Sequence, residues 1–153
     1  MPEPIVPQKF GPPMGMYSHG MIAGDLVIVA GQVGLGADGR VPGDDVGSQT
    51  KQALDNVRTV VEAAGCTMRD LVRLQTFLTR AEDIPGFMKA RQEVFPAYFP
   101  DRIYPPNTLL VVDRLVRPEL LVEIEAMAMR PRKAKGKAKA ARKRPPAARR
   151  RRR

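Results

Sequence analysis

Few side chains of this sequence could carry nucleophilic or metal chemistry. The chain contains one histidine, His19, and one cysteine, Cys66. A zinc-type cluster needs several such ligands, and no G-x-S-x-G elbow is present for a serine triad. The glycines of GQVGLG lack the spacing of a phosphate-binding loop and favour a hairpin loop. We expect His19 to be a hydrogen-bonded strand residue and Cys66 a small buried hydrophobe.

The amide of Asn107 is a further candidate, in the stretch YPPNTLLVV. Two prolines stop one element there, and an apolar run begins directly after the asparagine. Asparagine commonly bonds local backbone at such a position. Two interpretations therefore stay open, in which Asn107 either starts a strand or contacts a ligand beside it.

Hydrophobic periodicity predicts the elements that must position these residues. In chain order we expect strands at 17–23 and 26–31, a helix at 48–64, a strand at 71–79, a helix at 87–98, and strands at 108–112 and 120–129. A sheet with two helices on one face is the simplest solution of this β-β-α-β-α-β-β order, which makes the fold class α+β.

Individual residues predict where the helices begin and end. Ser48 is a suitable N-cap and Gly65 a suitable stop for the first helix. Pro96 is expected to kink the second helix or to end it early. The apolar run 108–112 is expected to be a strand covered on both faces.

The strand faces suggest an oligomer. Alternation places Val72 with Leu74 on one face of its strand. In the last strand, Leu121, Met127 and Met129 lie opposite the all-apolar face. This second apolar surface has no cover within the chain, so we expect copies to associate through it.

Charge divides the chain into two parts. Residues 131–153 contain 13 of the 26 Lys/Arg and none of the 16 Asp/Glu, so the remaining 13 basic and 16 acidic residues give residues 1–130 a net charge of −3. We expect one domain at 1–130 and a disordered basic tail at 131–153. We see no secretory signal and no membrane span, and one cysteine suggests the cytoplasm.

The tail predicts a polyanionic partner. Lys and Arg neutralise phosphates without sequence specificity, so non-specific DNA or RNA and a nucleoid association are expected, with a membrane surface or no partner as alternatives. The predicted contact residues are Lys133, Lys135, Lys137, Lys139, Arg142, Lys143, Arg144, Arg149, Arg150, Arg151, Arg152 and Arg153.

Several fragments, taken together, resemble one family. YSHG, VIVAGQVG, GSQTKQALDNVRTVVEAAGCTMRDLVRLQTFLTR, FMKARQEVFPAYFP and RPELLVEIEAMAMR resemble the Rid (YjgF) proteins, reactive intermediate deaminases once labelled L-PSP endoribonucleases. The resemblance covers about residues 10–130. It implies a chorismate-mutase-like fold, a homotrimer with its sheets inward, and small-molecule sites between subunits.

The resemblance also implies hydrolysis of enamines and imines to a keto acid and ammonia, with no metal or cofactor. By position, the resemblance implies that Glu123 is the catalytic residue, which positions or activates water. The substrate-binding positions implied in the same way are Tyr17, Ser18, Gly31, Arg91 and Asn107.

Asn107 departs from the family pattern, because deaminases of the family carry a carboxylate-binding arginine there. A guanidinium offers charge and a bidentate fork, whereas an amide offers neutral donors. We therefore expect 2-aminoacrylate deamination to be weak or lost. Arg91 or Arg102 is a candidate to restore the charge.

Two functions remain at this point. One is a Rid-like hydrolase with altered substrate preference, and the other is a non-enzymatic trimeric metabolite-binding module tethered to nucleic acid by the tail. Ribonuclease chemistry has weak support, since the sequence has no histidine pair.

Overall fold

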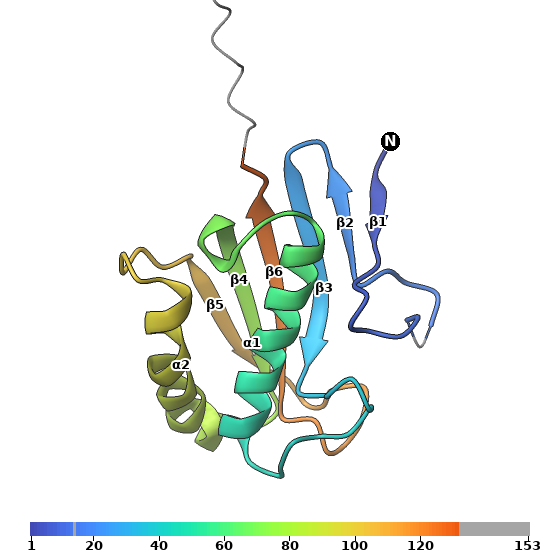
Figure 1. Cartoon of the computed structure of the whole chain (residues 1–153). Helices are drawn as coiled ribbons and strands as arrows, with labels where there is room; N and C mark the ends of the chain where they lie inside the picture. Colours follow the sequence, from blue (N-terminus) through green and yellow to red (C-terminus); the bar gives the residue numbers. More distant parts are fainter. Residues whose placement is uncertain (14, 132–153) are drawn as a thin grey trace, which may run out of the picture.

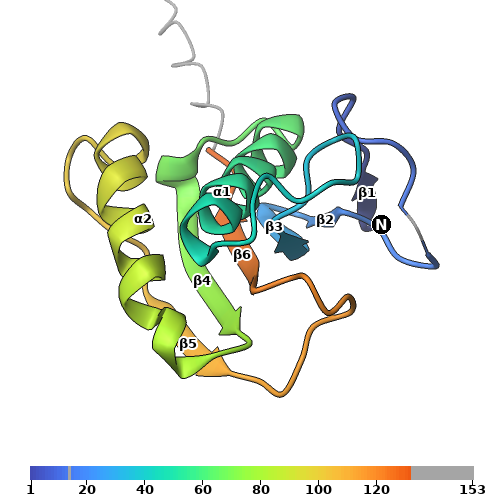
Figure 2. The same cartoon turned by 90° about the horizontal axis from the view of Figure 1, so that it is seen from below.

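The computed structural model describes residues 1–13 and 15–131. They form a six-stranded sheet with two helices packed on one face (Figures 1 and 2). The elements are β1 (Glu3–Ile5), β2 (Gly20–Ala23), β3 (Leu26–Val33), α1 (Val46–Ala63), β4 (Leu71–Leu78), α2 (Ile84–Tyr98), β5 (Asn107–Val111) and β6 (Val122–Met129). The α+β class and the two helices on one face are confirmed. The predicted tail and its contact residues lie outside the described residues, apart from Pro131.

The strands lie in the order β1-β2-β3-β6-β4-β5, and β4 and β5 are its one parallel pair. β1 was not predicted, because Pro4 lies inside it and proline argues against a strand. An edge strand tolerates proline, and β1 is such an edge, paired with β2 alone.

Helix α1 begins earlier than expected, at Val46. Its N-cap is Asp45, whose carboxylate accepts a hydrogen bond from the Ser48 amide at 2.8 Å. Ser48 is therefore inside the first turn and is not the cap. The predicted stop is confirmed, since Gly65 has a φ of 77°, a conformation that favours glycine.

Helix α2 continues through Pro96 to Tyr98, so the expected early end is wrong. Pro96 is exposed and lies in the last turns, where its ring removes only one hydrogen bond of the helix. Phe95 and Phe99, on either side of it, are buried and in edge-to-face contact at 5.0 Å. This aromatic packing holds the last turn in place.

Two predictions about strand faces are wrong. Val72 is exposed because the register of β4 against β6 shifts between Leu71 and Arg73, which puts Leu71 in the core instead. Strand β5 is not covered on both faces but is the outer edge of the sheet, with Leu110 and Val111 exposed. An apolar run alone cannot distinguish these two positions.

The core lies between the sheet and the helices. On β6, the residues Val122, Ile124, Ala126 and Ala128 are buried, as the alternation predicts. Leu121 precedes the strand and is only 8% exposed in this core, so it does not belong to the opposite face.

Candidate active site

Glu123 lies against the backbone of Gly31 on the open face of the sheet. The two residues belong to neighbouring strands β6 and β3, and Gly31 falls where their register shifts between Val29 and Gln32. A β-carbon added at Gly31 would collide with the Glu123 carboxylate. The absence of a side chain at Gly31 therefore gives this carboxylate its position.

The surroundings of Glu123 favour a proton on its carboxyl group. Burial raises the pKa of Glu123 above its ordinary value of 4.5, and repulsion from Glu125 raises it further. Within residues 1–13 and 15–131, no side chain forms a salt bridge or hydrogen bond with this carboxylate. A carboxyl group with a raised pKa is a candidate for taking up and releasing protons during a reaction.

Asn107 lies on the other face of the sheet. It pairs with Leu74 of β4, whose side chain is in the helix-covered core. Its side-chain oxygen accepts a hydrogen bond of 3.0 Å from the hydroxyl of Thr76, which is 1% exposed. The sheet therefore separates Asn107 from Glu123 within one chain.

Sequence reasoning did not find Thr76. Alternation along its strand indicates a core position, but no spacing pairs it with an asparagine on another strand. The pairing follows from the parallel contact of β4 with β5.

Tyr17 and Ser18 lie in the loop before β2, outside the strand predicted for 17–23. Tyr17 and Gly31 line one hollow of about 220 Å³, together with Phe10 and His19. The His19 ring is 5.1 Å from the Phe10 ring and 6.2 Å from the Tyr17 ring. His19 also lies before β2, where its Nε2 is 3.2 Å from the carbonyl oxygen of Gly11. The expected hydrogen bond is confirmed, whereas the expected strand position is wrong.

Arg91 lies on α2, and its guanidinium contacts the Phe95 ring. It shares the helix-covered side of the sheet with Asn107, away from Glu123. Cys66 is buried, and burial raises the pKa of its thiol, so it is the inert hydrophobe that was expected.

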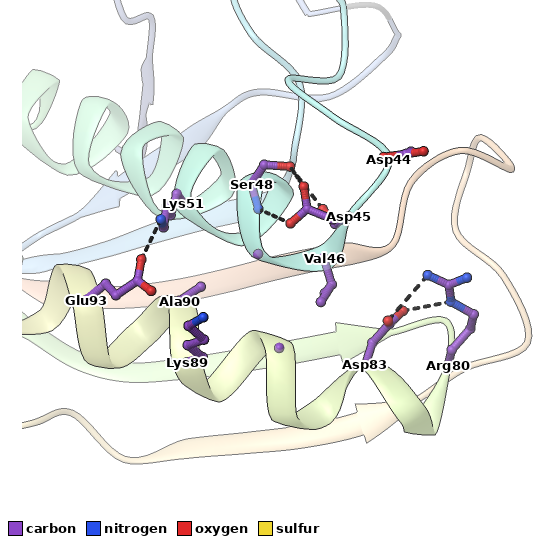
Figure 3. A pocket seen from close by; sticks show the side chains of 12 residues that line it. Asp44, Asp45, Val46, Ser48, Lys51, Arg80, Asp83, Lys89, Ala90 and Glu93 are labelled. Atoms are coloured by element: carbon purple, nitrogen blue, oxygen red, sulfur yellow. Dashed lines mark hydrogen bonds and ion pairs between the residues drawn. The ribbon is translucent and has the colours of Figure 1, made fainter.

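A larger hollow of about 640 Å³ opens between the beginnings of α1 and α2 (Figure 3). Four of its charged side chains form ion pairs, Lys51 with Glu93 and Arg80 with Asp83. Asp45 lies there as the cap of α1. These side chains cap α1, pair before α2 and join the two helices, and we do not place the active site here.

No group of three or more potential metal ligands occurs among the residues that the structure describes. Similarly, neither described helix is both long and apolar enough to cross a membrane.

Fold and site together define a small α+β protein with an exposed sheet face that carries a half-buried carboxylate. The chain belongs to the Rid (YjgF) family, since the family model described as Endoribonuclease L-PSP matches residues 9–130. The resemblance stated from the sequence is thereby confirmed.

Proteins from several organisms are similar over most of their length. The 2-iminobutanoate/2-iminopropanoate deaminase of Escherichia coli K12 is 32% identical over 131 residues, which cover 85% of this chain and 99% of the relative. A RutC family protein of Pyrococcus horikoshii is 33% identical over 129 residues, covering 84% and 98%.

Solved structures show the same fold. The crystal structure of E. coli TdcF with bound serine has a TM-score of 0.77 at 28% identity, covering 84% of this chain and 99% of TdcF. The E. coli YjgF gene product has a TM-score of 0.77 at 30% identity, with the same coverage. These likenesses confirm the predicted chorismate-mutase-like fold.

Proposed function

We propose that this chain is a deaminase-like hydrolase of imine or enamine metabolites, acting in a cleft between two subunits of a homotrimer. The observation that carries the proposal is the half-buried Glu123 carboxylate beside Gly31, with its raised pKa. The similarity to a 2-iminobutanoate/2-iminopropanoate deaminase supports this chemistry.

Glu123 serves as the proton carrier in this proposal. Water adds to the carbon of the C=N bond while the Glu123 carboxylate takes one of its protons. The nitrogen is protonated, the C–N bond breaks, and its electron pair leaves with ammonia. The products are a ketone and ammonia, and a carboxyl group with a raised pKa suits both proton transfers.

The need for two chains follows from the faces of the sheet. Asn107 faces the helices and Glu123 faces the open side, so one chain cannot present both to the same small molecule. A neighbouring copy laid on the open face would place its own β5 edge beside Glu123. Half-exposed Ile28 and Met127, which also lie on the open face, supply apolar surface for that contact.

Asn107 supports an altered substrate preference. Thr76 engages its side-chain oxygen, which leaves the amide NH₂ as a pair of neutral donors. Hydrogen bonds to charged groups contribute roughly 1.5–3 kcal/mol, against roughly 0.5–1.5 kcal/mol for neutral ones. We expect binding of a carboxylate at this position to be about 10- to 100-fold weaker than with arginine.

The test is an imine-hydrolysis assay with the full chain. A serine/threonine dehydratase generates 2-aminoacrylate and 2-iminopropanoate, and pyruvate release is followed. We expect turnover far below that of the E. coli relative, and a higher rate for Asn107→Arg. Equal rates for this chain and the relative would contradict the altered preference, and no gain with Asn107→Arg would argue against the site.

The second candidate is the non-enzymatic metabolite-binding module tethered to nucleic acid. It is favoured by the 13 positive charges and no acids in residues 131–153. The full chain is expected to bind DNA with an affinity that falls steeply with salt, whereas residues 1–130 are not. Equal, salt-insensitive binding by both would rule out the tail's role, and imine turnover would rule out the purely non-enzymatic module.

A further inference from the structure

Arg91 is a partly buried cation on the inward stripe of α2. Phe87, Arg91 and Phe95 follow one another at four-residue spacing, and both phenyl rings are buried. The central carbon of the guanidinium is 4.4 Å from the centroid of the Phe95 ring and 5.5 Å from that of Phe87. The charge is thus held between two rings of the core.

No described carboxylate compensates this charge. Four other described arginines form salt bridges, namely Arg58, Arg69, Arg80 and Arg117. The described arginines that form none are otherwise exposed, namely Arg40, Arg73, Arg102, Arg114 and Arg130. Arg91 makes one polar side-chain contact within the same residues, to the sulfur of Met88 at 3.9 Å. Burial lowers the pKa of Arg91 and no acid opposes that shift. Partial burial of an unpaired charge is unfavourable, and an anion would offset its cost.

The aromatic contacts prepare the guanidinium for such an anion. The contact with Phe95 restricts the side chain, and apart from the N–H directed at the Met88 sulfur the donors of the guanidinium have no described partner. Those donors match the two oxygens of a carboxylate or phosphate. The arrangement lowers the entropy that binding would otherwise remove.

Phe95 also connects Arg91 to the predicted site. The ring of Phe95 stacks on Tyr104 with centroids 5.9 Å apart, and Tyr104 is separated from Asn107 by two prolines. Asn107 and Arg91 both lie on the helix-covered side of the sheet. The segment before β5 is therefore linked to the Arg91 cation through two aromatic rings, those of Phe95 and Tyr104.

We propose that Arg91 is the anion-binding residue of the cleft, and that it selects imines with a carboxylate or phosphate remote from the C=N carbon. The remote position follows from the layers, because Arg91 belongs to the helix layer whereas Asn107 belongs to the sheet. This inference rests on the proposed function for its substrate class. Its anion-binding part is testable independently.

Calorimetric titration of the full chain tests the anion site with three probes: 2-oxoglutarate, pyruvate and inorganic phosphate. We expect 2-oxoglutarate or phosphate to bind more tightly than pyruvate, which has no second anionic group. Arg91→Met is expected to weaken the preferred anion about 10- to 100-fold. Arg91→Lys should fall in between, because it keeps the charge but loses the fork.

The control is Arg114→Met, which removes the same charge from an exposed position and should leave binding unchanged. Circular dichroism of each variant verifies the fold. Unchanged anion binding by a folded Arg91→Met variant would overturn the proposal, as would the absence of binding by the unsubstituted chain. If Arg91→Met alters sedimentation but not anion binding, Arg91 pairs instead with a carboxylate of a second copy. That result would also overturn the proposal.

Kinetics separate this inference from the proposed function. Hydrolysis of the imines of 2-oxoglutarate and pyruvate is compared, and Arg91→Met should raise KM for the first with little change in kcat. If Arg91→Met does not change turnover, the proposed hydrolase activity is retained and the proposed role of Arg91 is contradicted. If anion binding depends on Arg91 but no imine is turned over, the proposed hydrolase activity is contradicted and the anion site is supported.

Discussion

On the helix-covered face of the sheet, alternate residues of β4 and β6 are buried in the core. The open face instead carries Glu123, Glu125 and Arg73 among half-exposed apolar side chains. The apolar side chains of the first face are buried within one chain. The second has a carboxylate without a counter-charge and apolar surface without a cover. Stability of the chain should therefore depend on the apolar contacts of the covered face, and proton transfer and assembly on the open face.

The largest expected effect is on chemistry at the open face. In the Asn107→Arg background, Glu123→Gln should lower kcat for 2-iminopropanoate about 100- to 10,000-fold, because the amide cannot carry a proton. The free energy of unfolding should not fall, since glutamine keeps the volume and removes a poorly solvated charge. Glu62→Gln, on the exposed side of α1, is the control. Undiminished turnover would mean that Glu123 is not the proton carrier.

A stability comparison between the faces comes next in size. Leu78→Ala, in the helix-covered core, should lower the free energy of unfolding by about 2–5 kcal/mol. Ile28→Asp, on the open face, should instead shift sedimentation from trimer to monomer, because it places a charge in the proposed contact. Denaturant titration and sedimentation are run on both variants. An unsubstituted chain that sediments as a monomer at micromolar concentration would contradict the assembly.

The smallest expected effect is a pH dependence of stability. The folded chain binds the Glu123 proton more tightly than the unfolded chain, because the pKa of Glu123 is raised from 4.5. Its contribution is therefore most favourable below about pH 4.5 and is lost as the pH rises through the raised pKa. Glu123→Gln should remove this part of the curve, and Glu125→Gln should move it to lower pH. An identical curve for all three chains would show that the carboxyl group is not perturbed.

Several features of the fold were accessible from the sequence because they are local. The spacing of Leu54, Val57 and Val61 places them on one buried stripe of α1, since helical geometry repeats every 3.6 residues. Alternation along β6 likewise identifies its buried face. Gly65 ends α1 because its backbone conformation favours glycine.

Other features depend on contacts between distant segments. The bulge that exposes Val72 arises from the pairing of β4 with β6, and β5 is an edge because no later strand pairs with it. The N-cap shifted to Asp45 because its carboxylate, and not the Ser48 hydroxyl, accepts the amide bond. An apolar run or a single polar residue does not contain this information.

The candidate site divides in the same way. The sequence by itself determined the order of the elements after β1, the family, the departure at Asn107 and the concentration of positive charge in residues 131–153. Only the tertiary structure decided that Glu123 lies on Gly31, that Asn107 faces away from it, and that Arg91 lies between two phenyl rings without a described counter-ion. Backbone geometry sets side-chain direction within one segment, whereas neighbours across the sheet are set by pairing between segments far apart in the chain.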